Sequence, residues 1–196
     1  MNTTQQLWWA DAVDSRLTFN LRHLVLSQIA GVMRSWRATI QVDLEHPEQS
    51  SVEAVIDAGS LDTLDLSRDE HIRSGEFLDV GAYPEIRFRS RRVNIIDAAR
   101  SDLVGDLTIR GVTRAVTLSL EDKGRTRDGK GRERAAFHAH ATINRQDFGL
   151  RWNQDLDAGG VVVGDKIDVE IEVNAIAHGQ RPEVPEAARP AGARVE

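Results

Sequence analysis

The sequence contains no cysteine among its 196 residues, so disulfide bonds and thiolate metal sites are excluded. It has no excess of basic residues either, because 31 acidic residues against 25 basic ones give a formal net charge of -6. A phosphate backbone is bound by clustered lysine and arginine, so this balance argues against nucleic acid as a partner. Hydrophobic residues make up 40% and charged residues 29%, which is typical of one globular domain.

Long apolar segments are also missing. No stretch approaches the roughly 18 consecutive apolar residues of a membrane-spanning helix. The N-terminal segment MNTTQQLWWADAV holds neither the basic region nor the apolar region of a signal peptide. We therefore expect a cytoplasmic protein without a membrane span.

What the sequence does contain, over most of its length, is an alternation of apolar and polar residues with period two. This is the pattern of half-buried β-strands. Most of the alternating segments are separated by turn residues, such as Arg110-Gly111 and the GRTRDGKG segment at residues 124–131. Short strands with polar outer faces indicate a sandwich or a barrel, and closure into a barrel removes exposed strand edges. The segments are residues 17–22, 38–44, 52–57, 86–91, 103–109, 112–120, 137–143 and 167–173, which predict an all-β, eight-stranded antiparallel barrel.

One segment interrupts the strand pattern. Residues 67–78 read SRDEHIRSGEFL, in which Ser67 and Glu70 have the spacing of a capping box and Gly75 is a suitable helix stop. We predict a short helical insertion there, lying across one end of the barrel.

The C-terminal segment has a different composition. From residue 179 onward the sequence holds three of the five prolines, together with alanine and glutamate, and shows no strand pattern. We predict a barrel domain over residues 1–178 and a disordered tail over residues 179–196.

The inner face of the predicted barrel decides whether its centre is filled. Eight strands enclose a space just wide enough to be filled by side chains or to hold one small ligand. Small residues leave the centre open, whereas aromatic residues can line the wall around it. The small residues favour a hollow barrel that holds a long hydrocarbon guest. The general avoidance of voids in protein interiors favours a filled barrel or a close-packed sandwich, so the pattern alone does not decide between them. The small residues are Ala38, Ala54, Gly105, Ala139 and Ala141, and the aromatic ones are Phe19, Trp36, Phe88, Phe137, Phe148 and Trp152.

Several motifs occur in a fixed order along the chain. They include FNLRHL from Phe19, YPEIRFRS from Tyr83, GDLTIRGVT from Gly105 and NRQDFGL from Asn144. In their order and spacing these motifs resemble the YceI-like family, also called the polyisoprenoid-binding, lipocalin-like family. The resemblance covers about residues 12–175.

This resemblance implies a lipocalin-like barrel whose apolar interior binds a long-chain apolar small molecule of the isoprenoid, polyprenyl or quinone-precursor type. It supplies no defined catalytic residues, and because related proteins are often dimeric, a homodimer is one expected assembly. Asp14-Ser15 stands where the family commonly has His-Ser, which puts an assumed pyrophosphate site in question. We expect the ligand, isoprenoid or fatty-acid-like, to contact Phe19, Leu21, Trp36, Ala38, Ile40, Ala54, Ile56, Phe88, Leu107, Phe137, Ala139, Phe148 and Trp152.

Two groups of polar residues could instead serve chemistry. His138 and His140 share one face of a strand, as metal ligands often do, but the apolar residues between them take the inner face and no third ligand is evident. We therefore predict a solvent-facing pair. Arg68, Asp69 and His71 lie in the predicted helix and form either a polar gate for the ligand head or, as we favour, an anchoring network of caps and ion pairs.

The NRQDFG segment contains a further charged pair. We predict that Arg145 pairs with Asp147 and fixes a turn, which is a structural role.

Three functions follow from these observations. The first is a carrier or sequestering protein for a long apolar ligand, without enzymatic activity or cofactor. The second is an enzyme acting on such a ligand with His23, His71 or Asp69 as acid or base, although no nucleophile elbow, phosphate loop, dinucleotide fingerprint or metalloprotease motif supports it. The third is a filled barrel that acts as a structural or stress-response module.

Overall fold

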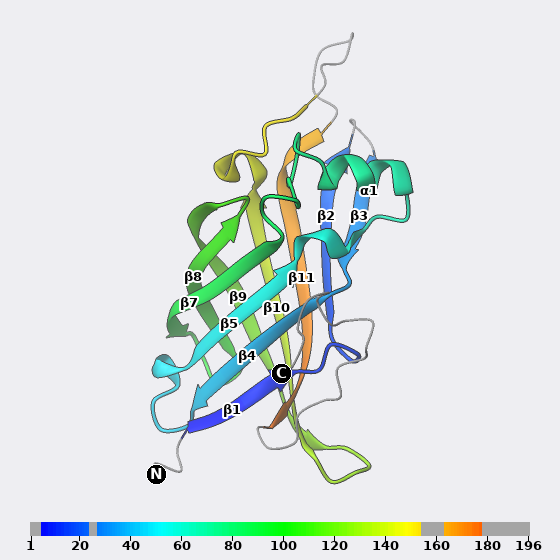
Figure 1. Ribbon diagram of the computed structural model, residues 1–196. Helices are drawn as coiled ribbons and strands as arrows, with labels where there is room; N and C mark the ends of the chain where they lie inside the picture. The colour runs from blue at the N-terminus through cyan, green and yellow to red at the C-terminus, as the bar shows by residue number, and fades with distance from the viewer. Residues whose placement is uncertain (1–4, 24–26, 154–162, 178–196) are drawn as a thin grey trace, which may run out of the picture.

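The computed structural model describes residues 5–23, 27–153 and 163–177, and in it one antiparallel sheet is rolled into a barrel (Figure 1). Its strands are β1 (Gln5–Ala10), β2 (Arg16–His23), β3 (Ser27–Met33), β4 (Trp36–Asp43), β5 (Ser51–Asp57), β6 (Leu61–Asp62), β7 (Glu85–Ile95), β8 (Arg100–Ile109), β9 (Val112–Arg127), β10 (Glu133–Asn144) and β11 (Val163–Ala177). Its helical elements are α1 (Leu66–Arg73) and the 3-10 turns η1 (Pro47–Gln49), η2 (Ala58–Ser60) and η3 (Arg145–Phe148). The predicted tail at residues 179–196 lies outside the described residues.

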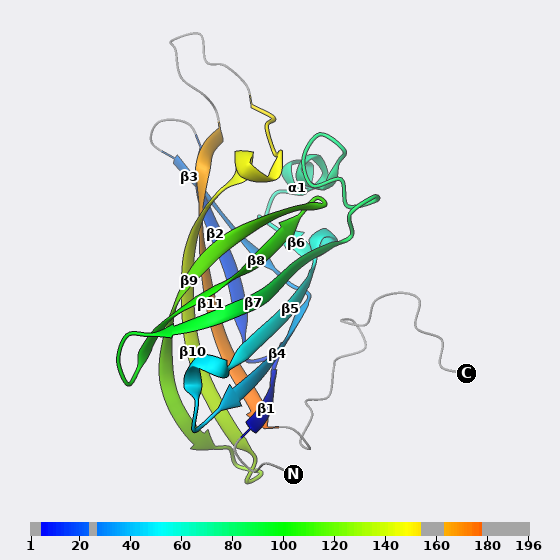
Figure 2. The ribbon, with the colours of Figure 1, turned by 90° about the vertical axis from the view of Figure 1, so that its left-hand side faces the viewer.

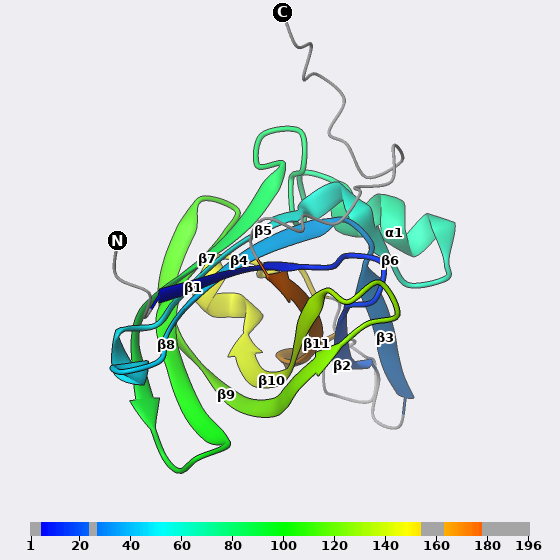
Figure 3. The ribbon, with the colours of Figure 1, turned by 90° about the horizontal axis from the view of Figure 1, so that it is seen from below.

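The sheet is an up-and-down meander of eight barrel strands, as the sequence predicted. Three of these strands consist of two successive segments each: β1 with β2, β3 with β4, and β5 with β6. Accordingly β4 pairs with β1 and β5, whereas β3 pairs with β2 and β6. The ring closes because β11 pairs with β10 along one edge and with both β1 and β2 along the other. Figure 3 looks along the barrel and shows the strands around a common axis.

The two ends of the barrel differ. α1 lies at the upper end, beside β3 and β6, whereas β1 and the turn between β9 and β10 lie at the lower end (Figures 1 and 2). None of the helices in the described ranges is long and apolar enough to cross a membrane. The end that carries α1 is called the helix end below, and the opposite end is called the floor.

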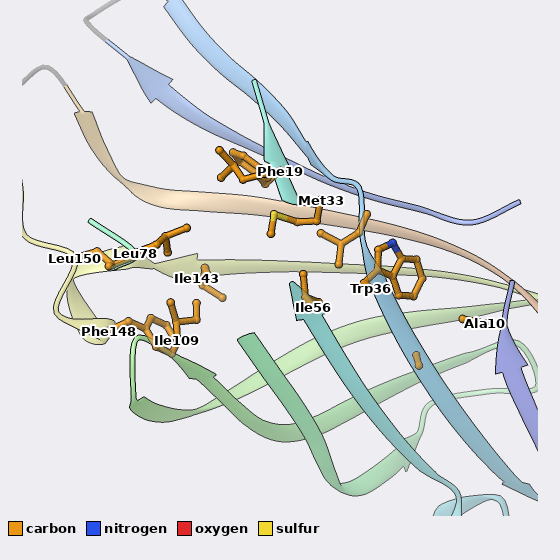
Figure 4. Packing of buried hydrophobic residues seen from close by; sticks show 13 residues of the cluster. Ala10, Phe19, Met33, Trp36, Ile56, Leu78, Ile109, Ile143, Phe148 and Leu150 are labelled. Carbon is orange, nitrogen blue, oxygen red and sulfur yellow. The ribbon is translucent and has the colours of Figure 1, made fainter. Parts of the chain in front are cut away.

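The alternation in the sequence becomes an alternation of inner and outer side chains. Along β10 the residues Ala135, Phe137, Ala139 and Ala141 are buried, and the residues between them are partly or fully exposed. Because successive side chains of a strand point to opposite faces, this pattern places every second residue of β10 inside the barrel. The apolar core is therefore the inner wall of the barrel. Figure 4 shows part of this wall, where buried side chains from several strands pack together.

A bulge separates β1 from β2. Residues 11–15 lie opposite Asn174, whose backbone N–H donates to Ser15 Oγ (2.9 Å) and whose side-chain amide donates to the Asp14 carbonyl (2.6 Å). The carboxylate of Asp14 lies 2.9 Å from Arg134 Nη1 and is therefore paired. It is not among the residues that line the barrel interior.

The predicted helix is present, but its bounds were wrong. α1 begins at Leu66, and its N-cap is Asp65, whose carboxylate accepts the backbone N–H of Arg68 at 3.0 Å. The helix ends at Arg73, because Ser74 has an extended backbone and donates its N–H back to the last turn. The capping box expected at Ser67 does not form, because the helix already begins at Leu66 and Ser67 lies inside its first turn, where it cannot be the N-cap.

The hairpin between β9 and β10 is longer than predicted. Residues 124–127 belong to β9, so only residues 128–132 form the turn. The carboxylate of Asp128 organises that turn by accepting the backbone N–H groups of Lys130 (2.9 Å) and Arg132 (3.0 Å). The loop was predicted over residues 124–131 because glycines stand at both of its ends. The contacts of the Asp128 carboxylate instead close a shorter turn.

Candidate functional site

Inside the barrel lies a cavity of about 590 Å³. Each of the eight barrel strands contributes apolar side chains to its wall, and polar side chains reach it only toward the helix end. The barrel is therefore hollow rather than filled. If a methylene group takes about the volume of a water molecule, roughly 30 Å³, the space holds on the order of 20 carbon atoms.

The small residues of the inner face account for part of this space. Ala38 and Ala54 lie directly opposite each other on β4 and β5, and Ala139 and Ala141 succeed each other on the inner face of β10. All of these alanines line the cavity. A larger side chain at any of these positions would extend toward the barrel axis.

Gly105 does not enlarge the cavity as the sequence suggested. A Cβ atom built on Gly105 would lie 2.6 Å from Phe88 Cζ and 2.6 Å from the carbonyl oxygen of Arg89. The ring of Phe88 therefore already occupies the space above the glycine. Gly31 lies under the ring of Phe19 in the same way. These glycines make room for two aromatic rings against the wall, which is a different role from opening the centre.

Most of the predicted ligand-contact residues are brought together around this cavity. Phe148 is the exception, because it is only 1% exposed and packs into the core cluster at the helix end, next to Leu150 and Ile109 in Figure 4. The others line the cavity: Phe19, Leu21, Trp36, Ala38, Ile40, Ala54, Ile56, Phe88, Leu107, Phe137, Ala139 and Trp152.

The sequence reasoning missed several wall residues. Ile29 and Met33 belong to β3, which was not predicted, although its apolar residues do alternate. Phe77 and Leu78 follow α1 in an irregular segment, where no periodicity could have marked them.

At the helix end, α1 is tied to the preceding turn by two of its charged residues. The Asp69 side chain, only 2% exposed, accepts the backbone N–H of Thr63 at 3.0 Å and its hydroxyl at 2.6 Å. Arg68 donates from Nε to Thr63 Oγ1 and from Nη2 to the Thr63 carbonyl, both at 2.8 Å. Both of these bonds to Asp69 end on Oδ1, and the Thr63 N–H lies 3.3 Å from Oδ2 as well, so this carboxylate holds the turn against α1. The predicted anchoring role is confirmed for Arg68 and Asp69, whereas His71 takes no part in these bonds, and both Arg68 and His71 line the cavity.

His71 lies between two aromatic rings at the same end. Its ring centroid is 4.5 Å from that of Trp152 and 5.7 Å from that of Phe77, both in edge-to-face contact. Its Nε2 atom lies 2.9 Å from Glu76 Oε2. Because His71, Phe77 and Trp152 all line the cavity, they form an aromatic cluster over its helix end. The side chain of His23, which the sequence also offers as an acid or base, lies outside the described part of the structure.

Arg145 holds the segment after β10 against β11. It is 1% exposed, and its guanidinium donates to the carbonyls of Gly164 (2.9 Å), Trp152 (2.9 Å), Val163 and Leu150. Its carboxylate partner is Asp165, at 3.2 Å, so the predicted pairing with Asp147 was wrong. Burial lowers the pKa of Arg145, and the nearby Asp165 opposes that shift. The predicted structural role fits these contacts.

The histidines of β10 face outward, as predicted. Across the strand pair, Glu170 of β11 lies 2.8 Å from His138 Nε2 and 3.9 Å from His140 Nε2. Within the described ranges, no group of three or more histidine, aspartate or glutamate residues is arranged to hold a metal ion. Glu170 became the partner of these histidines through the register of β10 with β11, which the spacing of residues along one strand does not reveal.

The chain is similar to known proteins in both sequence and fold. The model of the YceI-like domain matches residues 8–175. The chain is 37% identical over 133 residues to a UPF0312 protein of Pseudomonas savastanoi pv. phaseolicola, covering 68% of this chain and 69% of that protein. It resembles the crystal structure of the Campylobacter jejuni YceI protein with a TM-score of 0.68 and 27% identity, over 79% of this chain and 88% of that one. A polyisoprenoid binding domain from Saccharophagus degradans has the same fold, with a TM-score of 0.62 at 15% identity over 90% of this chain and 99% of that one.

Proposed function

The chain belongs to the YceI-like family, and on that premise we propose that it carries or sequesters a long isoprenoid-type molecule inside its barrel. The observation that carries the proposal is the cavity of about 590 Å³ with an apolar wall. Apolar surface is driven out of water without directional contacts, so such a wall selects for length and apolarity of the guest.

The size of the cavity sets the scale of the affinity. A guest of about 20 carbon atoms would gain about 0.8 kcal/mol for each buried methylene before ordering costs are subtracted. At a conservative net value of about 0.3 kcal/mol per atom, the same guest would bind by about 6 kcal/mol, which is a dissociation constant on the order of tens of micromolar. Measurable binding is therefore expected even if most of the gross gain is lost.

The chemistry of the wall supports a hydrocarbon chain of the isoprenoid or polyprenyl type, with fatty acids as a second class. The structural neighbour from Saccharophagus degradans is known as a polyisoprenoid binding domain, which agrees with the first class. A binding role, rather than an enzymatic one, is supported by Asp69 and Arg145, whose polar atoms serve the fold. The cytoplasmic location and a homodimer stay predictions.

The direct test is to identify what the protein binds. Native mass spectrometry of the protein purified from its own host should show a bound apolar species, and lipid analysis of a solvent extract should identify it. In parallel, the purified protein should take up a polyprenol or a long fatty alcohol added in detergent. A protein that carries no apolar species and takes up neither compound would overturn the proposal.

The enzymatic alternative makes a different prediction. An enzyme would convert the bound compound during incubation, and His71→Ala would abolish that conversion. A binding protein should release the compound unchanged in mass, and His71→Ala, at the aromatic cluster, should alter only retention of the ligand.

A further inference from the structure

Two leucines at the helix end are almost completely exposed. Leu64 is 89% exposed and Leu66 is 82% exposed, more than any other large apolar side chain that the structure describes. They stand on either side of Asp65, the N-cap of α1. Single apolar residues are common on protein surfaces, but two large ones side by side are typical of a contact site.

The backbone fixes Leu64 in a strained conformation. Its φ angle is +62°, in the left-handed region that residues with a large side chain seldom adopt. The turn is held from both sides, because Asp62 Oδ1 accepts the Leu64 N–H at 2.8 Å and the neighbouring Thr63 hydroxyl donates to Asp69 at 2.6 Å. Strain that is held this firmly, at a side chain that buries almost none of its own surface, points to a contact outside the chain.

The cavity opens beside these leucines. Asp65 and Ser67 are exposed to solvent and also line the cavity, so its mouth lies at the start of α1. At the floor, by contrast, Trp8 is 2% exposed and packs in one cluster with the cavity residue Phe137. The guanidinium carbon of Arg125 lies 5.5 Å from the ring centre of Trp8. Of the two ends, the helix end is therefore the one through which a long guest can enter.

The two carboxylates next to the leucines are each matched by an arginine. Arg34 Nε donates to Asp62 Oδ2 at 2.7 Å, and Arg68 Nη1 lies 3.7 Å from Asp65 Oδ2. Anionic lipid surfaces are bound by clusters of unmatched basic residues, which this arrangement does not provide. Contact with a lipid surface at this point therefore depends on burial of the leucine side chains and not on headgroup charge.

We propose that Leu64 and Leu66 dock the mouth of the barrel on a lipid bilayer with zwitterionic headgroups, so that the guest passes directly between the bilayer and the cavity. This rests on the proposed function and adds the surface from which the guest is taken. A long apolar chain is held in a bilayer by the same burial that holds it in the cavity. Direct contact at the mouth avoids exposing that chain to water during transfer.

The test measures how fast a fluorescent long-chain alcohol leaves the loaded protein for phosphatidylcholine vesicles. Transfer by contact should speed up as the vesicle concentration rises, whereas release through water has a rate that does not depend on it. The double substitution Leu64→Asn and Leu66→Asn should slow transfer by about tenfold or more, because two apolar side chains no longer enter the bilayer. Asparagine also tolerates the left-handed backbone at position 64.

The matched control is the double substitution Ile95→Asn and Ile96→Asn. It also removes two exposed apolar side chains, 51% and 57% exposed, but in the turn between β7 and β8, away from α1 (Figure 2). This control should transfer the alcohol as fast as the wild type. Equally slow transfer in both double variants would show a general effect of surface polarity and would contradict docking at the mouth.

Binding of the same alcohol in detergent, without vesicles, separates docking from the proposed function. It should be equal in all three proteins, since neither Leu64 nor Leu66 lines the cavity. If the wild type does not bind the alcohol in detergent, the proposed function fails and docking fails with it. If it binds, but its transfer rate is independent of vesicle concentration or matches that of the Leu64→Asn, Leu66→Asn variant, docking alone is overturned.

Two further measurements identify the occupant of this surface. The transfer rate should change less than about twofold when salt is raised or phosphatidylserine is added, because the nearby charges are already paired. A strong dependence on either would overturn docking by leucine burial. Sedimentation should show the same assembly state for the wild type and the leucine variant. A dimer that only the wild type forms would assign the leucines to a second copy of the chain and would overturn the proposal.

Discussion

Enlarging the alanines of β10 should shorten the longest chain that the barrel accepts. Ala139 and Ala141 lie on the inner face and line the cavity, so the double substitution Ala139→Leu and Ala141→Leu places six additional carbon atoms inside. At roughly 30 Å³ for each carbon, these side chains take up about 180 Å³. Because the cavity measures about 590 Å³, nearly a third of it is lost.

This loss can be expressed in ligand length and affinity. The limit should fall by about six methylene groups, and a ligand that filled the original space should lose up to about 5 kcal/mol at about 0.8 kcal/mol per methylene. The fold itself should not lose stability, because the new leucines enter open space. In a filled barrel the same change would be overpacking, which typically costs 1–3 kcal/mol.

The assay is a competition series with n-alkanols of increasing length against a fluorescent fatty-acid probe, together with denaturation in urea. His140→Leu is the matched control, because it introduces the same side chain on the outer face of the same strand and should leave the length limit unchanged. An unchanged length limit in the double variant, or a loss of stability of the size expected for overpacking, would refute the idea that this space receives the ligand.

Three further predictions concern the packing of Gly105, the contacts of Arg145 and the dependence of stability on acid pH. Gly105→Ala should lower the free energy of unfolding by about 1–3 kcal/mol in urea, because the new Cβ atom would overlap the ring of Phe88 and a backbone oxygen. Arg145→Lys should lower the free energy of unfolding by about 3 kcal/mol, since one ammonium cannot reach the several carbonyls that the guanidinium binds. Full stability in this variant would contradict the role of Arg145 in holding the segment after β10 against β11. The side chain of Arg100, with nearby backbone N–H groups, holds the pKa of Asp97 at about 2, below its ordinary 3.8. The stabilisation by Asp97 should therefore be complete above about pH 4 and be lost as the pH falls through about 2, and Asp97→Asn should remove this part of the pH dependence of urea denaturation.

Much of the wall could be predicted from the sequence because strand periodicity is a local property. A residue such as Ala139 is on the same face as Phe137 in any extended chain, whatever the rest of the fold does. The alternation therefore identified most inner residues, and the aromatic ones among them, before the barrel was known. Phe148 was misplaced because it follows the end of β10, in η3, where the period of two no longer applies.

The partners of the polar residues could not be predicted in the same way. The contacts of Arg145 with Asp165, of Glu170 with His138, and of Arg125 with Trp8 join segments that are distant along the chain. They depend on the register of neighbouring strands and on the closure of the ring. No residue spacing within one segment contains that information.

The sequence by itself thus determined one segment of each barrel strand, its inner and outer faces and the apolar character of the interior, because these follow from alternation over a few residues; β1, β3 and β6 were missed. Only the tertiary structure decided that the interior is hollow, that Gly105 is covered by Phe88, and that Trp8 lies under Arg125 at the floor. The physical reason is that the volume inside a barrel depends on how all of its strands are staggered and closed, and this arises only when residues far apart in the sequence meet.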